Sequence, residues 1–255
     1  MALLEVCCGN PESVDAAVAG GARRIELCAD LECDGLTPPM AWLRAVREKY
    51  PELTVHVLIR PREGDFVYSP EEADIMALQI ESALQFGADG IVVGCLTPDG
   101  DIDLPLMEQL VGLVESFNLA TELGASDLCH AANDSHFFPG PARRVSITFH
   151  RAFDRCRRPF EAMEQIIGLG CDRILTSGQA PTVEEGAERL RDLRQRAHGR
   201  IGILPGGGVT PSNAARILDL TGCTEIHASA SETVDGKKMT STEKVKAILQ
   251  SVRNR

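Results

Sequence analysis

The chain has 255 residues and a formal net charge of -11 at pH 7. This acidic balance disfavours nucleic acid and anionic membranes as partners, since both attract basic patches, although a small anionic ligand still fits a locally positive pocket. No apolar run approaches the length of a membrane span, no basic region precedes the first apolar run, and the nine cysteines form no CxxC pair, so we expect a reduced, cytoplasmic protein with no membrane partner.

Short β-branched apolar runs alternate eight times with stretches of helical periodicity. Parallel strands joined by right-handed helical crossovers produce this alternation, and eight such units, about 250 residues, close into a (β/α)8 barrel. We therefore predict an α/β chain that forms a single TIM barrel domain over residues 1–255, with functional residues at the C-terminal ends of the strands. The runs are Leu3–Cys8, Arg24–Cys28, Thr54–Arg60, Gly90–Leu96, Val145–His150, Arg173–Ser177, Ile201–Pro205 and Glu225–Ser229.

One segment interrupts this rhythm, between the fourth helical stretch and the fifth run. It covers residues 118–144, whereas a connection from helix to strand usually takes about 2–6 residues. We expect an inserted loop on the bottom face of the barrel, away from the usual site. A metal or partner site built from Cys129, His130 and His136 is the alternative.

Charged and imidazole side chains recur on one face of several predicted strands. Both faces of a barrel strand are buried, so such side chains fit best on the pore side near the mouth. We predict that Glu26 and His150 transfer protons there, with Glu5 in support. For the two glutamates, a buried ion-pair network that only holds the strands in register is the alternative. The pore-side set is Glu5 and Cys7; Glu26 and Cys28; His56, Leu58 and Arg60; Thr148 and His150; and Glu225, His227 and Ser229.

The loops that follow the strands supply candidate ligands for an anion. Two guanidinium groups flank a proline after the third run, where they could clamp a carboxylate or a phosphate, or else pair with a nearby acidic side chain. A run of three glycines after the seventh run lets the backbone approach a ligand, and many barrels bind phosphate at this position. The predicted anion ligands are Arg60, Arg62, Arg151, Ser177, Gly206, Gly207, Gly208 and His227.

Two cysteines form a candidate metal site. Cys7 and Cys28 lie two residues beyond Glu5 and Glu26 on adjacent strands, about 4.8 Å apart if the strands are in step. Two thiolates suit Cu(I), and Cys33 in the loop above could add a third ligand. The alternative is that these thiols are small buried hydrophobic groups.

Taken together, these segments resemble the CutC family, the copper homeostasis proteins. The resemblance implies a cytoplasmic barrel, commonly a homo-oligomer, that handles copper and binds Cu(I) through cysteine. This chain departs from the family pattern at Asp34 and Glu63, where glycine is usual, in the 118–144 insertion, and in a short eighth loop that reads Ser229-Ala230-Ser231. The matching segments are Leu4–Cys7, Arg24–Cys28, Gly35–Pro38, Ile59–Arg62 with Gly64–Phe66, Thr148–Asp154, Leu175–Gly178, Pro205–Gly208 and Glu225–His227.

Two functions are consistent with the sequence. One is copper handling, with Cys7 and Cys28 as Cu(I) ligands. The other is an enzyme that acts on a small anionic or phosphorylated metabolite, held by the arginines and the glycine loop while Glu26 and His150 move protons.

Overall fold

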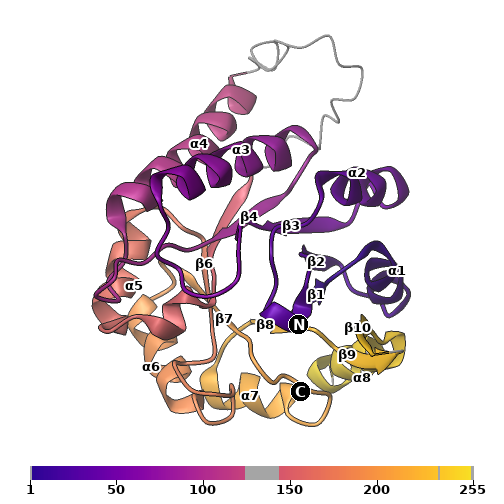
Figure 1. The fold of residues 1–255 in the computed structure, drawn as a ribbon. Coiled ribbons are helices and arrows are strands. Elements are labelled where there is room, and N and C mark those ends of the chain that lie inside the picture. Colours follow the sequence, from indigo (N-terminus) through magenta and orange to yellow (C-terminus); the bar gives the residue numbers. More distant parts are fainter. Residues whose placement is uncertain (1, 124–143, 235, 254–255) are drawn as a thin grey trace.

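The computed structural model describes residues 2–123, 144–234 and 236–253, and it confirms the predicted TIM barrel. Eight parallel strands form one sheet in the order β7-β6-β5-β4-β3-β2-β1-β8, and β7 and β8 lie side by side to close it. Figure 1 shows the helices arranged around these strands. The strands are β1 (Leu3–Cys8), β2 (Arg24–Leu27), β3 (Thr54–Leu58), β4 (Gly90–Val93), β5 (Ser146–Phe149), β6 (Arg173–Thr176), β7 (Gly202–Pro205) and β8 (Glu225–Ala228).

Three of the described helices, the first, third and fourth along the chain, begin at a residue whose side chain caps the first turn. Asn10 caps the first helix through Ser13 N–H, and Ser69 forms a capping box with Glu72 at the start of the third. Proline occupies the first turn in four of the described helices, where its missing N–H costs no hydrogen bond. The helices are α1 (Pro11–Ala19), α2 (Met40–Lys49), α3 (Pro70–Gln85), α4 (Leu104–Glu122), α5 (Pro159–Gly168), α6 (Ala187–Ala197), α7 (Ala214–Thr221) and α8 (Thr242–Arg253).

The hydrophobic core lies between the strands and the helices. Leu4, Val6, Ile25 and Phe149 alternate with pore-facing residues and pack in one continuous cluster with apolar side chains of the helices. A separate small cluster inside the barrel contains Cys7, Cys28, Leu58 and Val92. The pore is therefore apolar only in part, which leaves room for the charged groups predicted there.

The register of the first two strands differs from the one that the sequence analysis assumed. Glu5 pairs with Arg24, and Cys7 pairs with Glu26, so the two strands are offset by two residues. The strands of a barrel must be staggered for the sheet to close, and this stagger sets the offset. Cys7 is thus the register partner of Glu26, and Cys28 lies two residues further along β2, toward the carboxyl end of the barrel.

Helix α4 extends into the segment that was predicted to be an insertion. Helix α4 continues to Glu122, and its Asn118 side chain accepts a hydrogen bond from Val145 N–H (2.8 Å) and donates one to Val145 O (3.1 Å). Arg144 pairs with Asp172 and Glu115, so the end of the segment is also tied to the barrel. Residues 124–143, with the candidate site of Cys129, His130 and His136, lie outside the described residues.

A hairpin that the sequence did not predict follows β8. Strands β9 (Ser231–Val234) and β10 (Lys237–Thr240) pair antiparallel beside the barrel mouth. Lys238 Nζ donates to Leu31 O at 3.1 Å, which ties the hairpin to the 3-10 helix η1 (Leu31–Cys33) above β2. Within the described ranges, no helix is both long enough and apolar enough to span a membrane.

Candidate functional site at the barrel mouth

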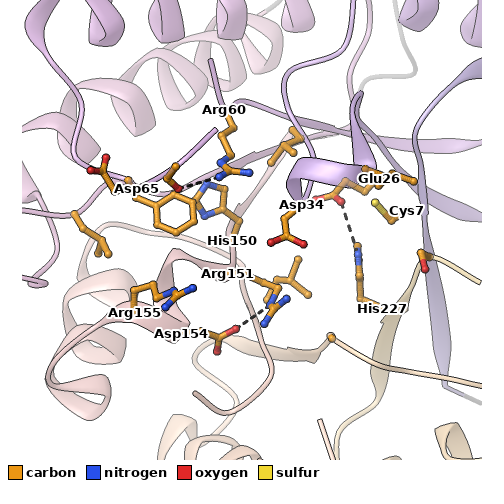
Figure 2. Close-up of a pocket in the computed structure, with 18 of the residues that line it drawn as sticks. Cys7, Glu26, Asp34, Arg60, Asp65, His150, Arg151, Asp154, Arg155 and His227 are labelled. Carbon is orange, nitrogen blue, oxygen red and sulfur yellow. Dashed lines mark hydrogen bonds and ion pairs between the residues drawn. The ribbon is translucent and has the colours of Figure 1, made fainter. Parts of the chain in front are cut away.

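A cavity of about 910 Å³ opens at the carboxyl ends of the strands, where barrel sites are expected (Figure 2). Eight of the predicted site residues line it: Cys7, Glu26, Arg60, His150, Arg151, Gly207, Gly208 and His227. Five others do not: Glu5, Cys28, Arg62, Ser177 and Gly206. The lining also contains acidic and basic groups that the sequence analysis did not single out for the site: Asp34, Asp65, Asp154, Arg155 and Lys238.

Glu5 lies beneath the cavity at the centre of a buried ionic network. Its carboxylate contacts Arg24 Nε (2.7 Å), His56 Nδ1 (2.8 Å) and His227 Nδ1 (2.9 Å). Burial alone would raise the pKa of Glu5, but His56, His227 and Arg24 together hold it well below its usual range. Glu5 is therefore a fixed negative charge that orients its partners.

The network continues across the pore through β8. Glu225 accepts from Arg24 Nη2 (2.7 Å) and from Arg173 Nε (2.9 Å), and Arg173 also donates to Ser146 Oγ (3.2 Å). Neither arginine was among the residues predicted to face the pore. The pore-facing position of Arg24 could have been predicted. It lies two residues before Glu26 on the same strand, so both side chains point to the same face, and Glu26 had been assigned to the pore.

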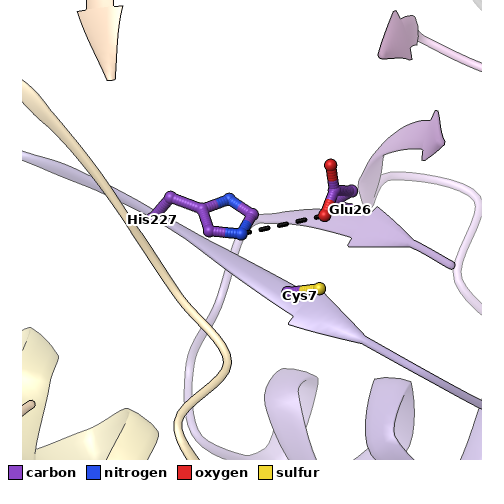
Figure 3. Close-up of side chains that lie close together, drawn as sticks. All are labelled: Cys7, Glu26 and His227. Atoms are coloured by element: carbon purple, nitrogen blue, oxygen red, sulfur yellow. Dashed lines mark ion pairs between the residues drawn. The ribbon is translucent and has the colours of Figure 1, made fainter. Parts of the chain in front are cut away.

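Cys7, Glu26 and His227 form a compact cluster on the cavity floor (Figure 3). Glu26 Oε2 lies 3.7 Å from His227 Nε2, and one donor atom from each of the three residues lies within 4.8 Å of the others. Burial raises the pKa of Glu26. Burial alone would lower the pKa of His227, but its contacts with Cys7 and Glu5 and the charge of Glu26 raise it well above the usual value. The floor can thus hold a shared proton, or a cation in its place.

The two candidate copper ligands touch each other. Cys7 Sγ and Cys28 Sγ are 3.4 Å apart, and the hydrogen bond between them, with burial, raises the pKa of Cys7 well above its usual value. A metal ion about 2.3 Å from each of two opposed sulfurs would hold them about 4.6 Å apart. Cys28 is fully buried against Leu58 and donates to Cys8 O, while Cys33 contacts Glu63 instead of this pair. As placed, the pair is a contact between two thiols, and a shared ion would require the sulfurs to separate.

Arg60 brings a buried positive charge to the cavity wall. Only 6% of Arg60 is exposed, and its guanidinium donates to the carbonyl oxygens of Cys33 (2.7 Å), Gly35 (2.9 Å) and Gly64 (3.1 Å). It also lies over the ring of Phe66. Among the described residues, we find no carboxylate paired with it. Arg60, predicted to bind an anion, therefore uses part of its hydrogen-bonding capacity to hold loops in place. No carboxylate among the described residues neutralises its positive charge.

His150 lies beside Arg60 and is fixed as a neutral ring. Its Nδ1 accepts from Ala152 N–H at 3.1 Å, so the neutral ring carries its proton on Nε2, which has no protein partner in the described part of the chain. Burial and the charge of Arg60 lower the pKa of His150 to about 3. As placed, the neutral ring offers its Nε2–H as a hydrogen-bond donor, and the predicted role of His150 in proton transfer stays a prediction.

The loops after β5 and β7 build the opposite wall, and the loop after β6 is hydrogen-bonded to the β5 loop. Arg151 begins the 3-10 helix η3 (Arg151–Arg155), and its Nε pairs with Asp154 Oδ2 at 2.9 Å. Asp154 also accepts from Thr176 Oγ1 and from Ser177 N–H, so it holds the β6 loop in place. The Ser177 hydroxyl donates to Ala180 O at 2.6 Å, and it stabilises the loop without lining the cavity.

The glycine loop faces Arg151. Gly207 has a φ of +107°, and a Cβ there would lie 3.2 Å from Ser177 Cβ and 3.4 Å from Arg151 Cζ. A Cβ on Gly206 would lie 2.5 Å from Leu175 Cδ1, so that glycine serves packing beneath the loop. Gly207 therefore brings backbone close to a guanidinium, whereas a Cβ on Gly208 would meet Thr182 (3.5 Å). The anion site stays a prediction.

Arg62 points away from this cavity. Its guanidinium pairs with Glu72 of α3 (2.5 Å) and with Asp65 (3.0 Å), and it donates to Val67 O. These contacts correspond to the salt-bridge alternative for this arginine. Arg62 thus braces the loop after β3 and does not line the cavity.

Comparisons with known proteins match all eight strands of the barrel. Residues 2–136 and 139–232 match the CutC family. The chain is 46% identical to a CutC family protein of Bacteroides fragilis over 232 residues, which cover 91% of this chain and 81% of that protein. It is 41% identical to one of Vibrio campbellii over 230 residues, which cover 90% and 82%.

Solved structures give the same picture of the fold. The copper homeostasis protein CutC from Streptococcus agalactiae superposes with a TM-score of 0.75 at 28% identity, over 90% of this chain and 99% of that chain. A KDPGal structure, with a TM-score of 0.57 and 16% identity over 99% of this chain and 94% of that chain, shares the barrel fold alone.

Proposed function

This chain belongs to the CutC family, and we propose that the cavity at the carboxyl end of its barrel binds a small anionic metabolite and moves a proton on it. The observation that carries the proposal is the guanidinium of Arg60, buried in the cavity wall without a carboxylate partner among the described residues. A buried charge is stabilised by an opposite charge, and a bound carboxylate or phosphate supplies one.

Donors on both sides of the cavity support an anion between them. On one side the Nε2–H of His150 adjoins Arg60. On the other, the guanidinium of Arg151 lies against the backbone of Gly207, near the position where many barrels bind phosphate. A carboxylate or phosphate of a bound metabolite would thus meet charge and N–H groups together.

The cavity floor supplies the proton chemistry. Glu26 has a raised pKa and lies next to His227, whose orientation is fixed by Glu5. A carboxyl group with a raised pKa is suited to take or give a proton at a reacting carbon or oxygen atom. We assign this role to Glu26, with His227 as its charged partner.

A thermal-shift screen of phosphorylated and carboxylated metabolites tests the anion site. We expect stabilising hits, and we expect Arg151→Ala to weaken the best hit at least tenfold. Arg157→Ala is the matched control, because Arg157 is exposed, pairs with Asp101 and does not line the cavity. A screen without hits, or equal loss in both variants, would overturn the proposal.

Copper handling is the second candidate. It is supported by the adjacency of Cys7 and Cys28, whose sulfurs would have to separate to hold an ion, and by the name of the Streptococcus agalactiae relative. Because two thiolates suit Cu(I), the double variant Cys7→Ala/Cys28→Ala should no longer compete with a Cu(I) chelator. Unchanged competition would remove this candidate. A cytoplasmic location and a homo-oligomeric assembly are also predictions, checked by cell fractionation and by light scattering.

A further inference from the structure

We propose that Cys7, Glu26 and His227 bind one divalent transition-metal ion of the zinc class on the cavity floor, with a coordination position open to the cavity. This site differs from the two-cysteine copper site, since it shares only Cys7 with it. The inference does not rest on the proposed enzyme function, because ion binding is measured without any substrate.

The donor atoms are spaced for one ion. One sulfur, one carboxylate oxygen and one imidazole nitrogen lie within 4.8 Å of one another, and the Glu26 to His227 distance is 3.7 Å. Ligands about 2.0–2.3 Å from a tetrahedral zinc ion are roughly 3.3–3.6 Å apart. Small side-chain rotations therefore suffice to close the site.

The strands hold these donors in place. Cys7 and Glu26 are register partners on β1 and β2, and His227 comes from β8 on the other side of β1. Three adjacent strands of the closed barrel thus present the donors from a rigid frame. Sites built on strands keep their geometry better than sites built on loops.

A second observation independently points to a metal ligand, namely the orientation of His227. Its Nδ1 contacts the carboxylate of Glu5 at 2.9 Å, which turns Nε2 toward Glu26. Glu5 is itself held by Arg24 and His56, so this orientation is not free to change. A carboxylate that fixes the second nitrogen of a histidine is the usual support of a metal-bound imidazole.

The charge of the three ligands and their access to the cavity also fit a divalent ion. A thiolate and a carboxylate together neutralise a divalent ion, which a buried site requires. All three residues line the cavity, so three protein ligands leave room for a water or a ligand atom, as in catalytic zinc sites. The mixed sulfur, nitrogen and oxygen set favours a borderline divalent ion over Cu(I), which prefers soft thiolates.

Cobalt(II) titration of the purified full chain, followed by absorption spectroscopy, tests the site. We expect one ion per chain, a sulfur-to-cobalt charge-transfer band in the near ultraviolet, and the intense visible bands of a four-coordinate ion. Cys7→Ser should abolish the charge-transfer band, and Glu26→Gln and His227→Gln should each weaken binding at least tenfold. Zinc should displace the cobalt and remove all of these bands.

Cys28→Ala is the matched control. Cys28 is buried beside Cys7 but belongs to the two-thiolate site, so its removal should leave cobalt affinity within about twofold. Glu5→Gln tests whether Glu5 orients His227 for the metal. We expect the variant to bind cobalt about 10–100-fold more weakly, because the supporting carboxylate is lost. The charge-transfer band should persist at saturating cobalt, because Cys7 is still present. Each variant is used only if its thermal unfolding remains cooperative.

Two outcomes would overturn the proposal. Absence of the charge-transfer band in the wild-type chain means that no thiolate binds the ion. Loss of the band in Cys28→Ala with normal affinity in Glu26→Gln and His227→Gln means that the ion uses the thiol pair instead. Metabolite hits that depend on Arg151 would survive either result, so failure of the metal site is distinguishable from failure of the anion site.

Discussion

At the residue scale, the environment of each side chain decides its chemistry more than its identity does. Arg60 and Arg62 looked equivalent in the sequence, yet one is buried among backbone carbonyls at the cavity and the other pairs with Glu72 outside it. Carbonyl acceptors leave no trace in a sequence, because every residue carries one. The roles of two such arginines could therefore not be separated before the structure was known.

The chemistry of His150 also depends on its environment, and its protonation state can be measured. Because burial and Arg60 lower its pKa to about 3, we expect the ring to stay neutral, with its proton on Nε2, from pH 8 to pH 5. Nitrogen-15 NMR of the histidine side chains distinguishes the two tautomers and the charged ring. A resonance of His150 that titrates near pH 6.5 would contradict this account of the cavity wall.

Gly94 makes room for that imidazole. A Cβ at Gly94 would lie 2.6 Å from His150 Nδ1 and 2.8 Å from its Cε1, so Gly94→Ala must displace the ring. We expect a loss of about 1–3 kcal/mol in the free energy of unfolding, measured by urea denaturation. Gly112→Ala is the control, because a Cβ there meets nothing within 4 Å on helix α4, and we expect a gain of roughly 0.5–1 kcal/mol. Equal effects in both variants would refute the steric argument.

At the element scale, the order of strands and helices could be predicted from the sequence, and so could the face of the sheet to which each strand residue points. The register between neighbouring strands could not. Parity correctly assigned Glu5, Glu26 and His227 to the pore side, because neighbours in a strand face opposite ways. The offset that sets Cys7 beside Glu26 follows from closure of the whole barrel, which no single strand encodes. The pairing of Cys7 with Cys28 could be predicted from the sequence, whereas for this reason the cluster of Cys7 with Glu26 and His227 could not.

The cross-strand ionic network predicts how stability depends on pH. Burial alone would raise the pKa of Glu225, but Arg24 and Arg173 lower it overall, so the ionised carboxylate stabilises the fold above the unfolded pKa of about 4.3. This contribution is lost as the pH falls through the lowered pKa. Glu225→Gln should thus cost about 1–3 kcal/mol at pH 7, with the difference from wild type shrinking below pH 4 in chemical denaturation.

The control for Glu225 is another acidic residue with an arginine partner. Glu115→Gln removes an exposed partner of Arg144, and we expect a change below about 1 kcal/mol at either pH. A pH-independent effect of Glu225→Gln, or an equal effect of Glu115→Gln, would contradict the role of the buried network.

At the scale of the whole molecule, the barrel and the location of its mouth could be predicted, because eight alternating units leave few other topologies. The hairpin of β9 and β10 could not be predicted, since each strand has only four residues and three of those eight residues are charged. The barrel and the hairpin both contribute to the cavity, which is lined by Lys238 of the hairpin and by residues of β1, β2 and β8. The site is thus a property of the closed fold, assembled from segments far apart in the chain.

The central claim is that an anion binds in this cavity between Arg60 with His150 and Arg151 with the glycine loop. The most direct test is a crystal structure of the protein soaked with the anion that stabilises it most in the thermal-shift screen. We predict density for the anionic group within hydrogen-bond distance of the Arg151 guanidinium and of the backbone N–H groups at Gly207 and Gly208. Density for the anion only outside the cavity, with the Arg151 guanidinium still contacting only Asp154 and Ser177, would contradict the account.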